Sequence, residues 1–360
     1  MFEDRPVLTG AKLSLLSLAR HNPELKVVAF FPGASDEFLR WASRLSNVEV
    51  RSSRGSVFGN GWNVKPTAIL TMLDEGHDQV LWLDTDIIVC GDLMARLDPI
   101  PPECIVGTEE YFWGHRQGSP LRTSGLGLAP SRVLPATVNT GLLRASKIHR
   151  PLVEHWASIV SGPEYFAAQK LSPTRRPIHL FDEQEVLTGL LGSSQYADID
   201  VVQLKRGVDI AQCFGPSGFT LKERLQAHGK IPLLVHTQGP KPWSKSEPKE
   251  RRSFSGRLMG YYQTAHLDVT PYVFVAMEYR DQMDEDVSWM SPATALGRGL
   301  SRLYKNQPLL REAPLTVIDS AQRKFRRVFH IGIVGSKADT SKLILRTDIN
   351  SARTLGDSSR

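Results

Sequence analysis

The sequence has few of the features that mark disulfide-rich, secreted or membrane-spanning proteins. Its 360 residues include only 3 cysteines, too few and too widely spaced for a disulfide framework or a zinc cluster. The most apolar stretch, 80–90, is shorter than the roughly 18 to 20 residues that a membrane span requires. Residues 1–6 lack the basic and then apolar pattern of a secretory signal. We therefore expect a cytoplasmic protein without a transmembrane helix.

The charge is unevenly distributed along the chain. The formal net charge is +6, but residues 291–360 carry 13 Lys and Arg against 5 Asp and Glu. This basic segment predicts either a solvated tail or peripheral contact with an anionic inner membrane, where a cytoplasmic enzyme would meet lipid-linked molecules. No recognised nucleic-acid-binding module accompanies the charge, so we expect no nucleic-acid partner.

Apolar periodicity alternates between helical and extended patterns over the first two thirds of the chain. The pattern predicts helices at 11–21, 35–45, 64–75 and 182–191, and strands at 26–31, 48–51, 79–89, 138–145 and 232–235. Such alternation predicts an α/β fold in which a mostly parallel, mixed sheet is flanked by helices. Beyond it we expect peripheral helices at 261–280 and 293–305. The expected division is a domain at 1–243, a linker with peripheral helices at 244–306 and a basic tail at 307–360.

Two aspartates follow the most strand-like run of the sequence. Asp84 and Asp86 come after four apolar positions, and side chains at i and i+2 of an extended segment point the same way. Paired carboxylates form a hard-oxygen site for Mn²⁺ or Mg²⁺, and such ions keep open positions that diphosphate oxygens fill. Paired surface acids without a function are the alternative interpretation, which the apolar frame disfavours.

A second polar segment follows a short apolar strand about 150 residues later. His236 offers an imidazole ligand, Gly239 lets the backbone approach a phosphate closely, and Lys241 adds a positive charge. A lone histidine at a strand end is more often structural. Its combination with the glycine and the lysine favours a diphosphate site that shares the metal.

These segments occur in an order that resembles glycosyltransferase family 8. The set comprises Asp84-Thr85-Asp86, Asn139-Thr140-Gly141, Asp182-Glu183-Gln184-Glu185 and the His236 to Trp243 segment. The resemblance covers residues 4–243 and implies a GT-A fold, which is Rossmann-like, with a helical, basic C-terminal extension. It also implies a metal-dependent enzyme that transfers a hexose from a UDP-sugar to a glycan or lipid-linked acceptor with retention of configuration, as in polysaccharide biosynthesis.

The resemblance also implies roles for individual residues. Asp84, Asp86 and His236 would bind the metal, and Gly239 and Lys241 would contact the diphosphate. Asp84 and Thr85 would also belong to the site that binds the donor nucleotide. Asp4, Lys65, Asn139 and Gly141 would meet the nucleotide or the donor sugar. Asp182, Glu183 and Gln184 would face the donor near the reacting carbon. Solvated or turn-forming roles remain the alternatives for Lys65, for the Asn139 turn and for the acidic segment.

The sequence departs from the family pattern at three places. The acidic segment reads Glu183-Gln184-Glu185 where the family usually has Asp-Gln-Asp, so either Asp182 or Glu183 could take the sugar-contacting role. The Lys-Pro-Trp segment lies one residue closer to its histidine than is common. The resemblance further implies that most of the family's first strand is missing from this sequence.

Two other functions remain open. A non-catalytic or degenerate nucleotide-sugar-binding protein would share the same motifs. A phosphatase of the haloacid dehalogenase type also places Asp-x-Asp after an apolar strand, with the first aspartate as its nucleophile. In that case Asp198 and Asp200 are the nearest candidates for its later acidic motif.

Overall fold

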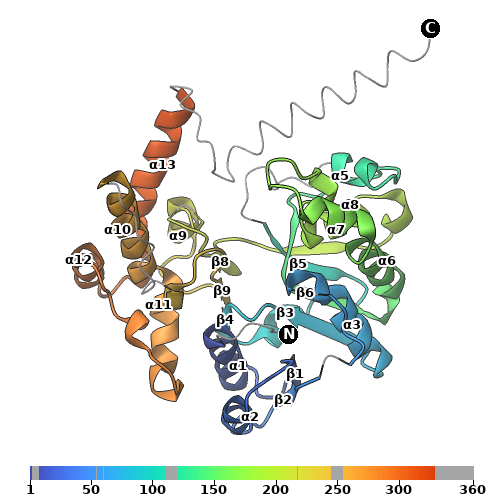
Figure 1. The fold of residues 1–360 in the computed structure, drawn as a ribbon, viewed down its shortest axis with the longest axis horizontal. Coiled ribbons are helices and arrows are strands. Elements are labelled where there is room, and N and C mark those ends of the chain that lie inside the picture. The colour runs from blue at the N-terminus through green and yellow to red at the C-terminus, as the bar shows by residue number, and fades with distance from the viewer. Residues whose placement is uncertain are drawn as a thin grey trace. The chain divides into compact units, whose positions relative to one another are not determined.

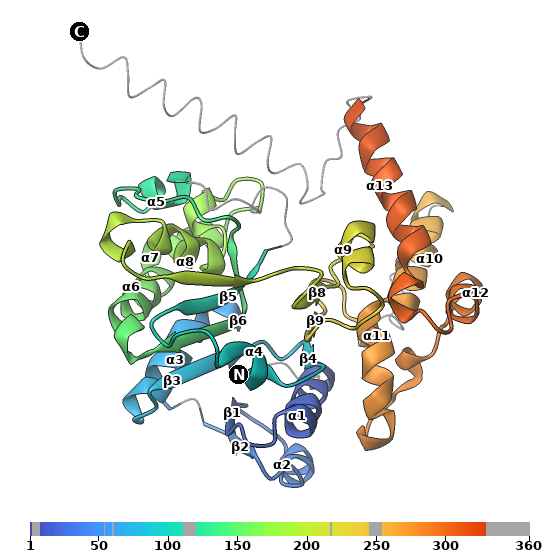
Figure 2. The same ribbon diagram turned by 180° about the vertical axis from the view of Figure 1, so that it is seen from behind.

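The computed structural model describes residues 1, 8–53, 55–59, 61–110, 120–216, 218–244 and 254–328, and Figures 1 and 2 show the fold from two sides. The chain forms two compact units. Unit 1 contains Met1–Gly55, Leu83–Pro101 and Leu204–Phe325, and unit 2 is built chiefly from Ser56–Trp82 and Pro102–Gln203. Within the described ranges, no helix has the length and apolar character needed to cross a membrane.

Unit 1 contains two small sheets. β1 (Val27–Phe30) and β2 (Val48–Arg51) pair in parallel. In the other sheet, β9 (Leu234–His236) lies between β4 (Ile87–Val89) and β8 (Ile210–Gln212), antiparallel to β4 and parallel to β8. The strands of this second sheet are completely buried, which explains why their short sequences are almost wholly apolar.

Helices from both the N-terminal and the C-terminal parts of the chain pack against these sheets. α1 (Thr9–His21) packs against β4, where the Ser17 hydroxyl accepts a hydrogen bond from the Val89 amide at 3.0 Å. α11 packs against β4 and β9. The helices of unit 1 are α1, α2 (Asp36–Ala42), α4 (Leu93–Leu97), α9 (Leu221–Gln226), α10 (Phe254–Val269), α11 (Pro271–Ala276), α12 (Ala295–Leu303) and α13 (Ala313–Val328).

Unit 2 is a four-stranded sheet with helices packed around it. The strand order is β3-β6-β5-β7, and β5 and β6 are antiparallel. The strands are β3 (Gln79–Leu83), β5 (Ile105–Glu109), β6 (Val138–Ser146) and β7 (Val201–Leu204). The helices are α3 (Lys65–Asp74), α5 (Pro120–Gly125), α6 (Arg150–Val160), α7 (Pro163–Gln169) and α8 (Glu183–Leu191). All nine residues of β6 are buried, so this strand forms the centre of the unit's core.

The prediction of a mixed α/β fold with parallel pairs and flanking helices is confirmed, and two boundaries differ. The strand predicted at 79–89 is divided into β3 and β4, because Asp84 to Asp86 form a turn in which the Ile87 amide donates to the Asp84 carbonyl at 3.3 Å. The helix predicted at 261–280 ends and restarts at Pro271, which lacks the amide that would continue α10.

The other predicted helices and strands agree more closely with those of the structure. Ser35 caps α2, and its hydroxyl accepts from the Phe38 amide at 3.2 Å, which is the usual chemistry of a serine N-cap. The predicted division at residues 243 and 306 stays a prediction.

Candidate active site

The first candidate cluster lies in unit 1 and joins two segments that are far apart in sequence. The β4–β9 register places Ile87 opposite His236, and the turn before β4 carries Asp84 and Asp86. One metal-ligating atom from each of Asp84, Asp86 and His236 lies within 4.8 Å of the others. Strand pairing therefore explains how residues about 150 positions apart converge.

Polar contacts hold Asp86 in an ionised form. His236 Nε2 lies 3.2 Å from Asp86 Oδ1, and the Lys241 ammonium donates to Asp86 Oδ2. Lys241 also donates to the Thr237 carbonyl at 2.6 Å. Burial of Asp86 opposes its ionisation, but the charges of Lys241 and His236 outweigh this and hold the pKa of the carboxyl well below its usual range. The result is a largely buried carboxylate with the Lys241 ammonium and the His236 imidazole beside it.

The donor set fits a hard divalent cation. Two carboxylates and one imidazole are ligands that Mn²⁺ and Mg²⁺ accept, and three protein ligands leave coordination positions for a substrate. His236 Nε2 is directed at Asp86, while its Nδ1 is buried and has no hydrogen-bond partner in the part of the chain that the structure describes. The residues therefore fit the metal that the sequence predicts.

The loop that follows His236 is shaped by its glycine and anchored by its tryptophan. Gly239 has φ +82°, and a Cβ at this position would lie 2.9 Å from the Phe214 ring. The Trp243 ring packs against Tyr272 and Trp289, each with a centroid separation of 5.9 Å. Only glycine combines this backbone conformation with such a close neighbour.

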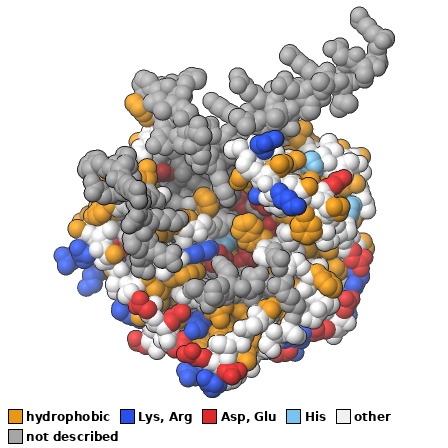
Figure 3. Space-filling view, viewed as in Figure 1, with side chains coloured by type: hydrophobic (Ala, Val, Ile, Leu, Met, Phe, Trp, Pro, Cys, Tyr) orange, Lys and Arg blue, Asp and Glu red, His pale blue; other side chains and the backbone are white. Residues whose placement is uncertain are grey.

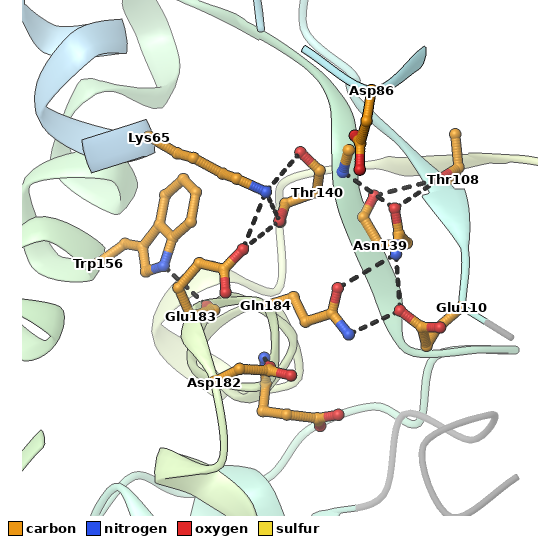
Figure 4. Close-up of polar contacts among 12 residues, drawn as sticks. Lys65, Asp86, Thr108, Glu110, Asn139, Thr140, Trp156, Asp182, Glu183 and Gln184 are labelled. Atoms are coloured by element: carbon orange, nitrogen blue, oxygen red, sulfur yellow. Dashed lines mark hydrogen bonds and ion pairs between the residues drawn. The ribbon is translucent and has the colours of Figure 1, made fainter. Parts of the chain in front are cut away.

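The second candidate cluster lies in unit 2 and is centred on a buried ion pair, as Figure 4 shows. Lys65 Nζ, at the start of α3, is 3.0 Å from Glu183 Oε1 and 3.0 Å from Thr140 Oγ1. The Thr140 hydroxyl donates to the same Glu183 oxygen at 2.7 Å, and the Trp156 indole donates to the Glu183 carbonyl at 2.9 Å. Lys65 and Glu183 are therefore not the solvated residues of the alternative interpretation.

Next to this ion pair, two amide side chains meet one carboxylate. Asn139 Nδ2 and Gln184 Nε2 each donate to Glu110 Oε2 at 2.6 Å. Asn139 Oδ1 in turn accepts from the Gly141 amide at 2.9 Å. Asn139, Gln184 and Glu110 are 2%, 8% and 1% exposed, which makes Gln184 the most accessible of the three.

The residues of the acidic segment have different partners. Asp182 is the N-cap of α8, and its side chain accepts from the Glu185 amide at 3.1 Å. Glu185 forms a wholly buried ion pair with Arg122, whose guanidinium also donates to Thr137 Oγ1 at 3.1 Å. Glu183 pairs with Lys65 and Gln184 with Glu110. Three consecutive polar residues at the start of α8 are thus buried, each held by a different partner.

The sequence-predicted residues fall into these two groups, and their roles stay predictions. Unit 1 brings together Asp84, Asp86, His236 and Lys241, and Thr85 in the same turn is 5% exposed. Unit 2 brings together Lys65, Asn139, Gly141, Glu183 and Gln184. Asp4 lies outside the described residues.

Glu110 and Phe214 have no role in the predictions from the sequence. Glu110 directly follows the apolar strand β5, the same signal that identified Asp84 and Asp86, but no second acid at i+2 accompanies it. For Phe214 the sequence carries no comparable signal.

Comparison with known proteins returned structural likenesses alone. No family model and no curated protein sequence matches the chain. It is similar to the apo bifunctional glycosyltransferase WbbM (14% identity, TM-score 0.41, covering 79% of this chain and 51% of that one). It is also similar to the glycosyltransferase GlyE of Streptococcus pneumoniae (14%, 0.44, 78% and 62%). The galactosyltransferase LgtC with donor and acceptor sugar analogues is a further likeness (15%, 0.40, 78% and 98%).

All three are glycosyltransferases, the class that the motif resemblance implies. The chain spans 51% of WbbM and 62% of GlyE. Each TM-score is below 0.5, so the two side-chain clusters and the order of the motifs bear on the function more directly than these likenesses do.

Proposed function

We propose that the protein is a GT-A glycosyltransferase that transfers a hexose from a UDP-sugar to a glycan or lipid-linked acceptor, with a divalent metal, Mn²⁺ or Mg²⁺, at Asp84, Asp86 and His236. The convergence of these three side chains carries the proposal, because their atoms lie within 4.8 Å of one another although His236 comes from a distant segment. The sequence predicted this grouping from the two motifs alone. Retention of configuration rests on the resemblance to family 8.

The residues of unit 1 would hold the diphosphate of the donor. Asp84 and Asp86 supply negative charge for the cation, and Lys241 supplies a positive charge beside Asp86. When bound, the cation would neutralise the charge of the departing diphosphate. Gly239 itself has no side chain to obstruct the loop, so that backbone amides can approach phosphate oxygens.

The resemblance to family 8 assigns the donor sugar to Asn139 and Gln184. Gln184 presents an amide at the least buried end of its network, and Asn139 lies beside it with a 3.3 Å hydrogen bond between them. The carbonyl oxygen of an amide stabilises positive charge that develops on a sugar carbon during cleavage of its bond to phosphate. We assign this role to Gln184. Lys65 and Glu183 neutralise each other and would hold the surrounding backbone in place.

Calorimetric titration of UDP tests the proposal directly. We expect UDP to bind in the presence of Mn²⁺ and to bind weakly or not at all in its absence, because the cation links the carboxylates to the phosphates. Asp86→Asn should abolish the metal-dependent part of binding. Asp98→Asn, a change of the same kind at an exposed helix end of unit 1, should leave binding unchanged.

The outcomes separate the candidate functions. Metal-dependent UDP binding together with slow hydrolysis of a UDP-sugar supports the transferase. UDP binding without turnover of any UDP-sugar would favour a non-catalytic nucleotide-sugar-binding protein. Absence of UDP binding in the wild-type chain would refute the donor site.

For the acceptor side, we propose peripheral contact of the C-terminal helices with an anionic inner membrane. On α12, Leu303 is 73% and Leu296 is 38% exposed, and the exposed Arg298 and Arg302 lie between them. Phe325 of α13 is 56% exposed. Figure 3 shows apolar, basic and acidic side chains interspersed over one face of the molecule. Cations beside exposed apolar groups suit a negatively charged lipid surface.

Co-sedimentation with vesicles tests this contact. The wild-type chain should sediment with phosphatidylglycerol vesicles and remain in solution with phosphatidylcholine vesicles. Leu303→Ser combined with Phe325→Ser should weaken sedimentation severalfold. Leu171→Ser removes an exposed leucine from unit 2 and serves as the control. Equal sedimentation of both variants would rule out this surface.

A further inference from the structure

A buried carboxylate that no sequence motif singles out connects the two amide residues of unit 2. Glu110 follows β5 and is 1% exposed. Its backbone amide donates to the Thr137 carbonyl at 3.0 Å, which fixes the residue against β6. One oxygen of its side chain, Oε2, accepts both 2.6 Å hydrogen bonds from Asn139 and Gln184. Bonds of this length to a carboxylate are stronger than bonds between neutral groups.

The partners of Asn139 leave its amide a single orientation. Its Oδ1 faces the Gly141 amide, which can only donate, at 2.9 Å. Its NH₂ group must then face Glu110, because an ionised carboxylate can only accept. Thr108 Oγ1 lies 3.3 Å from both this Oδ1 and the Asn139 backbone carbonyl, and its single hydroxyl hydrogen can donate to either. A flipped amide would place a donor against a donor and an acceptor against an acceptor.

The orientation of Gln184 follows from Glu110 and Asn139 together. Gln184 Nε2 donates to Glu110, so its Oε1 is the other branch of the amide, and it accepts from Asn139 Nδ2 at 3.3 Å. That carbonyl oxygen retains a second lone pair. The backbone of Gln184 is fixed as well, because its carbonyl accepts from the Thr188 hydroxyl at 2.8 Å, and Thr188 accepts from the Val138 amide of β6 at 3.0 Å.

We propose that Glu110 is a positioning residue that sets which end of the Gln184 amide faces the reacting sugar. The proposal rests on the function proposed above. The sign of the Gln184 amide dipole matters for that function, since a carbonyl oxygen stabilises a developing positive charge whereas an NH₂ group opposes it. Glu110 itself need not touch the substrate. It withholds the NH₂ group by binding it and so leaves the carbonyl oxygen available.

The charge-neutral variant Glu110→Gln tests the proposal with little change in volume. The new amide can accept one hydrogen bond but presents an NH₂ group as well, so the orientations of Asn139 and Gln184 are no longer unique. We expect the kcat for UDP-sugar hydrolysis to fall about tenfold to a hundredfold, the range that misplacement of a catalytic group produces. The KM for the donor and the affinity for UDP should change less than about threefold, because the diphosphate residues are unaltered.

Two further variants separate positioning from general structural damage. Glu110→Asp keeps an acceptor-only group and should restore part of the lost kcat. Glu109→Gln makes the same chemical change one residue earlier, where the strand directs the side chain to the other face, and should leave kcat unchanged. An unchanged kcat in Glu110→Gln, or an equal loss in both glutamine variants, would overturn the proposal. A rise in KM that matches the fall in kcat/KM, with kcat unchanged, would also overturn it.

A readout without turnover keeps this test distinct from a failure of the proposed enzyme activity. With glutamine and asparagine labelled at the side-chain nitrogen, the NH₂ resonances of Gln184 and Asn139 should be dispersed in the wild-type chain. They should shift and broaden in Glu110→Gln and stay unchanged in Glu109→Gln. If the wild-type chain turns over no UDP-sugar, the enzyme proposal fails and these resonances still decide whether Glu110 orients the amides. Unchanged resonances in Glu110→Gln would refute that orientation.

Discussion

Two glycines of unit 1 share a backbone conformation but differ in their surroundings. Gly239 has φ +82° with the Phe214 ring 2.9 Å from its absent Cβ, whereas Gly229 has φ +77° with nothing within 4 Å. An alanine in the left-handed region costs roughly 1 to 2 kcal/mol at either position. At position 239 the new methyl group must also displace a ring or the loop itself. A comparison of alanine variants at the two positions therefore distinguishes the effect of backbone strain from the effect of displacing the loop.

Gly239→Ala should weaken UDP binding about tenfold or more, because the loop would move away from the position in which its amides approach phosphate. Gly229→Ala should lower the free energy of unfolding by roughly 1 to 2 kcal/mol, the cost of an alanine in the left-handed region, and should leave UDP binding unchanged. Calorimetry for binding and denaturant unfolding for stability provide the two measurements. Equal UDP affinities for the two variants would show that the loop does not contact the nucleotide.

At the residue scale, the sequence predicts chemistry better than burial. Asp84, Asp86 and His236 lie close together in the structure, and a strand end is a local signal that the sequence carries, while their role as metal ligands stays a prediction. The partners of Lys65 and Gln184 were not predictable, since they depend on which side chains of β5, β6 and α8 meet in the core. Such pairings are set by tertiary contacts, and sequence spacing does not encode them.

Three helices of unit 1 meet at a buried group of charges. Glu312, just before α13, forms ion pairs with Arg224 of α9 and with His266 of α10. Arg224 and Glu312 are each 1% exposed, and Arg224 Nε also donates to the Phe219 carbonyl at 3.0 Å. Burial of Glu312 opposes its ionisation, but the charges of His266 and Arg224 outweigh this and lower the pKa of its carboxyl from 4.5.

The lowered pKa predicts how this group contributes to stability as pH changes. A carboxyl with a depressed folded-state pKa contributes stability that is present above its unfolded pKa, near 4.5, and that is lost as pH falls through the folded-state pKa. Glu312→Gln should therefore be less stable than the wild-type chain at pH 7, by about 3 to 5 kcal/mol because Arg224 is left buried without its partner. The difference in unfolding free energy between the wild-type chain and Glu312→Gln should become smaller below about pH 4.5.

Denaturant unfolding at a series of pH values measures this difference. Glu278→Gln, which removes a half-exposed partner of Arg20, is the matched control and should have little effect at any pH. A stability difference for Glu312→Gln that is constant from pH 7 to pH 3 would contradict a role for the ionised carboxylate.

At the element scale, the sequence predicts helices and strands wherever a strong local rule applies. The Ser35 cap and the helix that begins after Asp182 follow directly from N-cap chemistry. The division of the 79–89 run was missed because its apolar pattern continues across Asp84 to Asp86, while the turn there is held by contacts to β9, among them the 3.1 Å bond from the Thr237 amide to the Asp86 carbonyl.

Over the whole molecule, two of the three cysteines can report on unfolding. Burial raises the pKa of Cys90 and of Cys213 to about 12. At pH 8 only about one in ten thousand of these thiols would be ionised in the folded chain, and the thiolate is the reactive form. We expect both thiols to be silent towards a disulfide reagent until the protein unfolds.

A thiol titration with and without urea measures this prediction. In urea all 3 cysteines should react at the rate of free cysteine. At urea concentrations just below the unfolding midpoint, addition of UDP and Mn²⁺ should slow thiol labelling, because a ligand that binds the folded state lowers the unfolded population. Fast labelling of Cys213 in the absence of urea would show that unit 1 opens locally.

The fold class was predictable from alternating periodicity, but the arrangement into two units was not. Periodicity is a local property, whereas each unit contains segments that are far apart in the sequence, about a hundred residues in one case. The resemblance treated residues 1–243 as one domain, and nothing in the composition marks the points near 55, 83, 102 and 204 where the chain passes from one unit to the other.

This interleaving sets the order in which the protein can assemble during synthesis. The main segments of unit 2 have all been made once residue 203 emerges from the ribosome, whereas unit 1 needs residues beyond 204 to complete its central sheet. The strand β4 is synthesised before β9, with which it pairs, and Asp86 is likewise synthesised before His236. During that time β4 exposes an unpaired apolar edge, which makes the nascent chain a natural client for a chaperone that shields such strands.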